Sequence, residues 1–313
     1  MNRGKVVIVG AGSVGTAIAY SMVNQCICEE IVIIDLNHAK AYAESLDMMH
    51  SMEFMNTKTL VREGDYNDCS DADIVVISAS MPVPKESNDR MKFLDGSKKI
   101  VKSIVTNVME NNFNGIFIVV TNPVDVMSYY VWKLSGLPAN RIIGSGTTLD
   151  TARLHYYIAK TIDVDPRSIN AFIIGEHGDT ELVSWSTATI GGKDIKNVFD
   201  DNKNRIGEDP YNNFLKLTAH GGWDIFNKKG NTSFGIAASV TGIIKSILFD
   251  ENRIYPVSVY LDGEYDIYDV FTSVPTIVNR TGAKEIVELN LTEGEYKNFK
   301  YSCDTLKEKC NNL

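Results

Sequence analysis

The first constraint on the fold is an apolar strand that runs directly into a glycine-rich turn. Residues 5–9 read Lys-Val-Val-Ile-Val, and a GxGxxG turn at residues 10–15 follows and opens a helix. Such glycines permit a tight turn and let backbone N–H groups approach a pyrophosphate at the helix N-terminus. Asp35 ends the next apolar run, where its carboxylate can accept hydrogen bonds from ribose hydroxyls. We therefore predict a dinucleotide site formed by Gly10, Gly12, Ser13, Val14, Gly15 and Asp35.

Asp35 also indicates which dinucleotide is bound. A carboxylate repels a 2′-phosphate, and the residues that follow, Leu36-Asn37-His38, include no arginine to counter it. NAD is therefore favoured over NADP. The alternative is that Asp35 is an ordinary turn-forming residue at the end of a strand.

The first half of the chain alternates apolar runs with helix-length segments. Because strands buried on both faces are continuously apolar and parallel strands need helical crossovers, this half predicts an α/β Rossmann fold with a doubly wound parallel sheet. The predicted strands are residues 6–9, 31–34, 74–77, 116–120 and 141–143, and the clearest helices are 15–24 and 96–110.

The second half predicts an α+β domain with antiparallel strands. We place the boundary after Gly144, which gives an NAD-binding domain at 1–144 and a substrate and catalytic domain at 145–313. The elements expected here are a strand at 168–174, helices at 211–228 and 233–248, and strands at 257–260, 269–274 and 285–289.

Composition excludes several classes of protein. A net charge of −9 argues against a nucleic-acid surface, which is normally basic. The five cysteines form no CxxC pair, and the chain starts with neither a signal-like nor a membrane-spanning segment. We expect reduced thiols and a soluble cytoplasmic protein that binds neither membrane nor nucleic acid.

Three side chains could carry acid–base chemistry on an anionic substrate. His177 lies in the run Ile-Ile-Gly-Glu-His-Gly-Asp, and Asp150 and Arg153 stand one helical turn apart upstream. An imidazole titrates near neutral pH, a carboxylate can orient it, and a guanidinium can pair with a substrate carboxylate. Taken singly, His177 could be a packed histidine, Asp150 a helix N-cap and Arg153 a surface charge. Asn122 follows the fourth strand, at the sheet edge where open α/β sheets bind ligands.

Five motifs, in order along the chain, give it a resemblance to a known family. They are VGAGSVG, VTNPVD, GSGTTLDTAR, IIGEHGDTE and SVPTIVNRTG. With these, the chain resembles the L-lactate/L-malate dehydrogenase family along essentially its whole length. It is most similar to L-lactate dehydrogenases and their L-2-hydroxyisocaproate branch.

The resemblance implies an NAD-dependent L-2-hydroxy-acid dehydrogenase and a role for each site residue. His177 would exchange the proton with the substrate, Asp150 would orient the His177 ring, and Arg153 would bind the substrate carboxylate. Arg90 would lie on a closing loop and polarise the reacting carbonyl. Asn122 would contact substrate and cofactor, and Thr232 the substrate pocket. The implied residues of the cofactor cleft are Lys40, Tyr66, Ser103 and Ser145. No metal is needed, and we expect a homotetramer, with a dimer as the alternative.

The chain departs from the family pattern near the substrate. Val83 or Pro84 stands where lactate enzymes carry glutamine and malate enzymes carry arginine, so neither residue can pair with a second carboxylate. Gly221 and Gly222 resemble the hydroxyisocaproate branch, where small residues make room for longer side chains; the alternative is a break in the helix. A malate dehydrogenase and a non-catalytic NAD-binding sensor are the less favoured hypotheses.

The resemblance also bears on regulation. Many bacterial lactate dehydrogenases bind fructose 1,6-bisphosphate between subunits through an arginine and a histidine. This chain has His155 and Asn170 at the matching positions, which supply little fixed positive charge. We expect no marked activation by this ligand.

Overall fold

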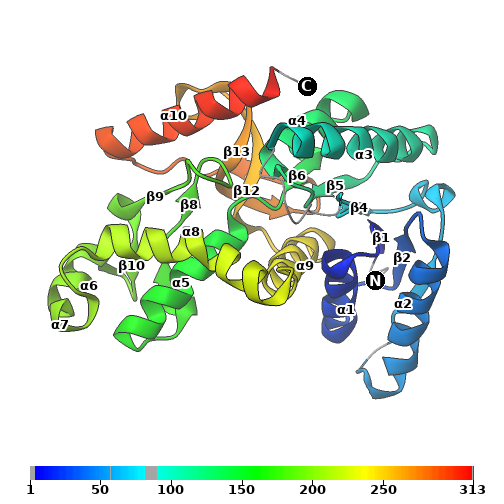
Figure 1. The fold of residues 1–313 in the computed structure, drawn as a ribbon, viewed down its shortest axis with the longest axis horizontal. Helices are drawn as coiled ribbons and strands as arrows, with labels where there is room; N and C mark the ends of the chain where they lie inside the picture. The colour runs from blue at the N-terminus through cyan, green and yellow to red at the C-terminus, as the bar shows by residue number, and fades with distance from the viewer. Residues whose placement is uncertain (1–3, 57, 82–89, 312) are drawn as a thin grey trace.

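The computed structural model describes residues 4–56, 58–81, 90–311 and 313. Nine strands of this described chain form one sheet, in the order β14-β13-β12-β6-β5-β4-β1-β2-β3 (Figure 1). Its parallel part is β1 (Lys5–Val9), β2 (Glu30–Ile34), β3 (Leu60–Glu63), β4 (Ile74–Ile77), β5 (Ile116–Val119) and β6 (Ile142–Gly144). The order β3-β2-β1-β4-β5-β6 is that of a doubly wound Rossmann sheet, so the predicted fold class is confirmed.

Strand β3 was not among the predicted strands. It is short, it carries two charged residues in four, and it lies at the edge of the sheet, where it pairs only with β2 among the described strands. An edge strand is covered less than a central one and therefore lacks the continuous apolar run by which the others are recognised.

Helices cover both faces of the parallel strands. They are α1 (Ser13–Gln25), α2 (His38–His50), α3 (Arg90–Glu110) and α4 (Val124–Ser135). Helix α1 packs against α9 (Phe234–Leu248), whereas α3 packs against α4 on the opposite face (Figure 1). Helix α9, from the second half of the chain, thus completes the helical layer on one face of the parallel strands.

The late strands are antiparallel, as predicted, but they extend the same sheet. They are β12 (Arg253–Asp262), β13 (Tyr268–Asn279) and β14 (Gly282–Ile286). Strand β12 pairs antiparallel with β6 through Ser258 and Gly144. The sheet therefore crosses the predicted boundary after Gly144, and one apolar core includes side chains from both halves.

The single strand expected at 168–174 is wrong. It is divided into β7 (Ile169–Asn170) and β8 (Ile173–Ile174), because the two pieces pair with different partners. Strand β7 joins β10 and β11 in a small sheet, and β8 pairs with β9. The bounds of the partners are Leu182–Val183 for β9, Thr189–Ile190 for β10 and Lys193–Asp194 for β11.

The second half contains a further helical layer with a separate apolar cluster. Its helices are α5 (Thr148–Ile162), α6 (Ile195–Asp201), α7 (Lys203–Ile206) and α8 (Pro210–Lys229), and α10 (Glu293–Cys310) ends the chain. Helix α8 runs unbroken through Gly221 and Gly222, so the alternative of a helix break there is wrong. Short 3₁₀ helices cover Ser51–Phe54, Tyr66–Cys69, Ala139–Arg141, Pro166–Ser168, Trp185–Thr187 and Glu264–Asp266.

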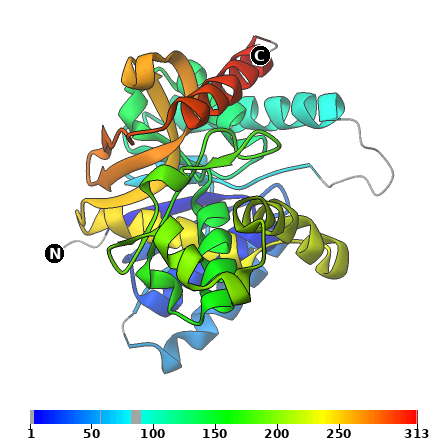
Figure 2. The same ribbon diagram turned by 90° about the vertical axis from the view of Figure 1, so that its left-hand side faces the viewer.

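Helix α10 was not predicted, although its start has a clear signal. Thr292 and Glu295 form a capping box, in which each side chain bonds the backbone N–H of the other residue. The helix packs against β13 and α4, and Figure 2 shows it at the upper edge of the molecule. Across the described residues, no helix combines the length and apolar character needed to span a membrane.

Candidate active site

The glycine turn after β1 is shaped by two close backbone contacts. Gly10 has a φ of +115°, and a Cβ there would lie 2.7 Å from the backbone nitrogen of Ala79. A Cβ on Gly15 would overlap the carbonyl oxygen of Gly10. A Cβ on Gly12, by contrast, would meet no heavy atom of the described chain within 4 Å. The turn therefore packs tightly on its inner side and leaves open space at the N-terminus of α1, which fits the approach of a pyrophosphate.

Asp35 lies against this turn. Its Oδ2 accepts a hydrogen bond of 2.7 Å from the N–H of Ala11, and its Oδ1 accepts one of 2.8 Å from the N–H of Asn37. Both bonds orient the carboxylate at the carboxyl end of β2, next to the glycines. Each oxygen keeps a lone pair that a ribose hydroxyl can use.

The other predicted cofactor residues divide into two groups. Tyr66 lies close enough to Asp35 for that charge to act on it: burial raises the pKa of Tyr66, and the charges of Cys69 and Asp35 add to the rise. Ser145 is buried directly after β6. Lys40 and Ser103 are exposed on α2 and α3. In the described part of the chain, no side-chain hydrogen bond or ion pair joins either of them to the glycine turn.

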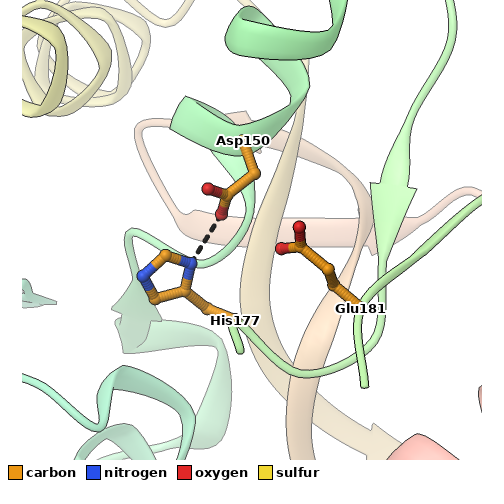
Figure 3. Close-up of side chains that lie close together, drawn as sticks. All are labelled: Asp150, His177 and Glu181. Atoms are coloured by element: carbon orange, nitrogen blue, oxygen red, sulfur yellow. Dashed lines mark hydrogen bonds and ion pairs between the residues drawn. The ribbon is translucent and has the colours of Figure 1, made fainter. Parts of the chain in front are cut away.

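The predicted proton-transfer pair is in direct contact. Nδ1 of His177 lies 2.5 Å from Oδ2 of Asp150 (Figure 3). Asp150 is buried in the first turn of α5, whose N-cap is Thr147, so the alternative that Asp150 is the N-cap is wrong. The His177 side chain keeps 30% of its surface exposed. Its Nε2 is thus left for a ligand.

The two partners hold each other in their charged forms. The charge of Asp150 raises the pKa of His177 to about 9, against an opposing effect of burial and with help from their hydrogen bond. Burial pushes the pKa of Asp150 upward, but the charges and hydrogen bonds of His177 and Arg153 outweigh it, and the pKa is lowered. The geometry therefore favours an imidazolium, the form that can donate a proton.

Arg153 approaches the same carboxylate from the next turn of α5. Its Nη1 donates a hydrogen bond of 2.7 Å to Oδ1 of Asp150. The guanidinium is fixed on one side, and its other N–H groups are left to pair with an anion.

The two glycines of α8 both border the side chain of Arg153, but at different atoms. A Cβ on Gly222 would lie 3.3 Å from Nη2 of Arg153, whereas one on Gly221 would lie 3.1 Å from the hydroxyl oxygen of Tyr157. Only Gly222 therefore borders the guanidinium. Gly221 makes room for the ring of Tyr157 and lies beside the aliphatic part of Arg153, 3.6 Å from its Cδ.

Other predicted substrate residues are less constrained by the structure. Asn122 is exposed at the carboxyl end of β5, and its carbonyl oxygen accepts a hydrogen bond of 2.8 Å from Ser97. Thr232 is half-buried between α8 and α9. Arg90 begins α3, but its side chain lies outside the described part of the structure, as do Val83 and Pro84.

Two acidic residues near His177 were not predicted as site residues from the sequence. Asp125 is buried at the start of α4, and its Oδ2 accepts a hydrogen bond of 2.8 Å from the backbone N–H of His177. Burial raises the pKa of Asp125 to about 6, although hydrogen bonds and the charge of His177 oppose the rise. Glu181 is the second, four residues after His177. Asp125 ends the motif VTNPVD and Glu181 ends the motif IIGEHGDTE. Their place in these two family motifs was the sequence signal that could have identified them.

The loop that carries His177 is anchored by distant parts of the chain. Gly175 pairs with Ser273 of β13, and the N–H of Glu176 donates a hydrogen bond of 2.8 Å to Oγ of Ser302 on α10. The buried carboxylate of Glu176 also forms an ion pair with Lys309. Helix α10 therefore fixes the residue that precedes the imidazole.

Comparison with known proteins gives a consistent result. Residues 4–144 match the model for the lactate/malate dehydrogenase NAD binding domain, and residues 147–313 match that for the lactate/malate dehydrogenase alpha/beta C-terminal domain. L-lactate dehydrogenase 3 of Bacillus thuringiensis subsp. konkukian is 48% identical over 304 residues, covering 97% of this chain and 96% of the relative. L-lactate dehydrogenase 1 of Bifidobacterium longum is 45% identical over 313 residues, covering 100% and 99%.

A solved structure has nearly the same fold. The ligand-bound minor L-lactate dehydrogenase of Enterococcus mundtii superimposes with a TM-score of 0.96 at 40% identity. The match covers 100% of this chain and 99% of that one.

Proposed function

The chain belongs to the lactate/malate dehydrogenase family, and we propose that it interconverts a 2-oxo acid such as pyruvate and the corresponding L-2-hydroxy acid with NAD as cofactor. One observation carries the proposal. Asp150 is hydrogen-bonded to His177 and to Arg153 at once, so a proton donor and a carboxylate-binding group face the same space.

The residues of this cluster divide the work of reduction. Arg153 binds the carboxylate of the 2-oxo acid, and its contact with Asp150 sets the orientation of that bond. NADH, when bound, supplies the hydride to the carbonyl carbon. His177 donates its proton from Nε2 to the carbonyl oxygen, and in the reverse direction the neutral ring accepts it. Asp150 stabilises the imidazolium and holds Nδ1.

Further roles are part of the proposal. Arg90 polarises the carbonyl from a closing loop, Asn122 contacts substrate and cofactor, and Thr232 contacts the substrate. The residues proposed to hold NAD are Gly10, Gly12, Ser13, Val14, Gly15, Asp35, Lys40, Tyr66, Ser103, Asn122 and Ser145. The open N-terminus of α1 and the position of Asp35 support this assignment.

We also propose the division into domains at 1–144 and 145–313, a cytoplasmic location and assembly into a homotetramer. The five free thiols suit a reducing compartment. Apolar side chains are exposed on α2, at Tyr42 and Leu46, and on α8, at Trp223 and Ile225, which offer surface for subunit contacts. Sedimentation velocity measures the assembly directly, and a monomer at micromolar concentration would contradict it.

The substrate class is tested by a panel of pyruvate, 2-oxoisocaproate, phenylpyruvate and oxaloacetate with NADH. We expect pyruvate to be reduced and oxaloacetate to be poor, because Val83 and Pro84 cannot pair with its second carboxylate. Turnover of 2-oxoisocaproate above that of pyruvate would favour the hydroxyisocaproate branch, since Gly222 leaves space beside Arg153. Oxaloacetate as the best substrate would overturn the assignment.

A variant tests the proton donor. Replacing His177 by Ala should lower kcat for pyruvate at least ~10²-fold while NADH binding stays nearly unchanged. His50→Ala, at an exposed position on α2, is the matched control and should retain full activity. Normal turnover in His177→Ala would remove His177 from the mechanism, whereas NADH binding without turnover in the unmodified protein would favour a non-catalytic sensor.

A further inference from the structure

Glu181 is a carboxyl group to which the roles above assign no function. One of its carboxylate oxygens, an oxygen of Asp150 and a ring nitrogen of His177 all lie within 4.8 Å of one another. Figure 3 shows the Glu181 side chain turned toward the pair formed by the other two. Any charge on Glu181 is therefore felt directly at the site of proton transfer.

The surroundings of Glu181 favour its uncharged form. Its Oε1 is buried and has no hydrogen-bond partner among the described residues. A negative charge on a buried oxygen that no donor contacts is costly, and a neighbouring carboxylate adds repulsion, so such a group tends to retain its proton. Burial raises the pKa of Glu181 to about 8 and the charge of Asp150 adds to the rise, while His177 and Arg153 oppose it.

Charges on every neighbouring element bear on this group. Asp150 and Arg153 face it from α5, His177 and Glu176 belong to its own loop, and Asp125 of α4 lies behind the backbone of His177. Glu176 is itself paired with Lys309. A substrate carboxylate at Arg153 would add one negative charge to this set, and an ionised Glu181 would add another in the same low-dielectric space.

We propose that Glu181 is an affinity-determining residue that must keep its proton for the 2-oxo acid anion to bind well. The inference rests on the proposed function, because it requires an anionic substrate at Arg153. Protonation of Glu181 and binding of the anion then favour each other reciprocally, as linked equilibria must. Ionised Glu181 weakens the interaction of the anion with Arg153 and with the imidazolium of His177.

The test is the pH dependence of KM, compared with that of kcat, for pyruvate at saturating NADH. In the unmodified enzyme KM should rise about tenfold between about pH 7 and pH 9 as Glu181 loses its proton. Glu181→Gln keeps the shape without the charge, so its KM should stay flat until His177 deprotonates near pH 9. Glu285→Gln, which removes one charge from an exposed position on β14, should behave like the unmodified enzyme.

Binding without turnover supplies a second measurement, which does not depend on catalytic rate. Titration of the enzyme–NADH complex with oxamate, an unreactive isostere of pyruvate, in buffers of different ionisation enthalpy should show proton uptake at about pH 8.5. Uptake should be smaller in Glu181→Gln.

Two results would overturn the inference while leaving the proposed function in place. One is an identical pH dependence of KM in the unmodified enzyme and in Glu181→Gln. The other is an equal proton uptake on oxamate binding in the unmodified enzyme and in Glu181→Gln. If no acid of the panel is reduced even by the unmodified protein, the proposed function fails, and the inference fails with it.

Discussion

The buried carboxylate of Asp125 accepts a hydrogen bond of 2.8 Å from the backbone N–H of His177. This contact joins the start of α4, in the first half of the chain, to the loop that carries the imidazole. Its partner atom is main chain, so the side chain of His177 stays available for Asp150 and for substrate. The loop that carries the imidazole is therefore tied to a carboxyl group that lies inside the protein.

Asp125 should make stability depend on pH in an unusual direction. Its pKa is raised to about 6 in the folded protein, so the folded state binds more protons than the unfolded state between about pH 4 and pH 6. The contribution of this group to stability thus falls as pH rises through that window, by up to about 3 kcal/mol. Asp125→Asn, which cannot ionise, should gain stability relative to the unmodified protein over the same range in urea unfolding.

The exposed Asp47 of α2 provides the control for that measurement. Asp47→Asn should follow the stability of the unmodified protein across the window. A constant difference in unfolding free energy between Asp125→Asn and the unmodified protein at every pH would contradict the expectation.

Replacing Asp150 by Asn should lower the alkaline limit of activity. The charge of Asp150 is the largest cause of the raised pKa of His177, and reduction needs the protonated ring, which exists below that pKa. In Asp150→Asn the fall in kcat/KM for pyruvate should therefore begin well below pH 9, with a loss of at least ~10²-fold at neutral pH. Asp163→Asn, at the other end of α5, should keep the pH profile of the unmodified enzyme. If the alkaline limit of activity is not shifted in Asp150→Asn, the Asp150 carboxylate does not raise the pKa of His177.

Asp35 should select NADH over NADPH. Because its carboxylate lies against the glycine turn and repels a 2′-phosphate, kcat/KM should favour NADH by at least ~10-fold, equivalent to about 1.4 kcal/mol. In Asp35→Ser the ratio of kcat/KM for NADH to kcat/KM for NADPH should be smaller. Equal use of the two cofactors by the unmodified enzyme would show that this carboxylate does not face the ribose.

Gly222→Ala should act on substrate binding through Arg153. The added methyl group would lie 3.3 Å from Nη2, so the guanidinium must shift or the space beside it must shrink. We expect KM for 2-oxoisocaproate to rise about tenfold, with a smaller effect on pyruvate. Gly294→Ala on α10, where a Cβ would meet no described heavy atom within 4 Å, is the control. Unchanged KM values for both acids would place Gly222 outside the pocket.

Fructose 1,6-bisphosphate should not activate the enzyme at neutral pH. Nε2 of His155 lies 2.8 Å from the carbonyl oxygen of Ala171, and burial lowers the pKa of His155, so this ring is neutral. Asn170 is exposed and uncharged. Little affinity for the bisphosphate follows, and a ligand shifts an equilibrium only through differential affinity. The measurement is KM for pyruvate at increasing concentrations of the bisphosphate, and a several-fold fall would disprove the expectation.

Much of this protein could be predicted from local patterns in the chain. The buried strands of the Rossmann half are continuously apolar, and the glycine turn and Asp35 each follow one of them. The order of residues along the chain was therefore enough to place the turn and Asp35 at the same edge of a sheet. His177, Asp150 and Arg153 were predicted from motifs. Edge strand β3 has a weaker apolar pattern and was missed, and helix α10 was missed although a capping box marks its start.

The hydrogen-bond partners of the polar groups depend on the three-dimensional packing of the chain. Asp125, Asp150 and Glu181 are similar carboxylic acids in the sequence, yet their partners differ. Among the described residues, Asp125 accepts a hydrogen bond from a backbone N–H through Oδ2 and leaves Oδ1 without a partner, Asp150 is paired with two cations, and the buried Oε1 of Glu181 has no partner. Burial and neighbouring charge set the protonation of each, and both depend on elements far apart in the chain. The order of residues specifies which chemical groups are present, whereas their charge states follow from packing.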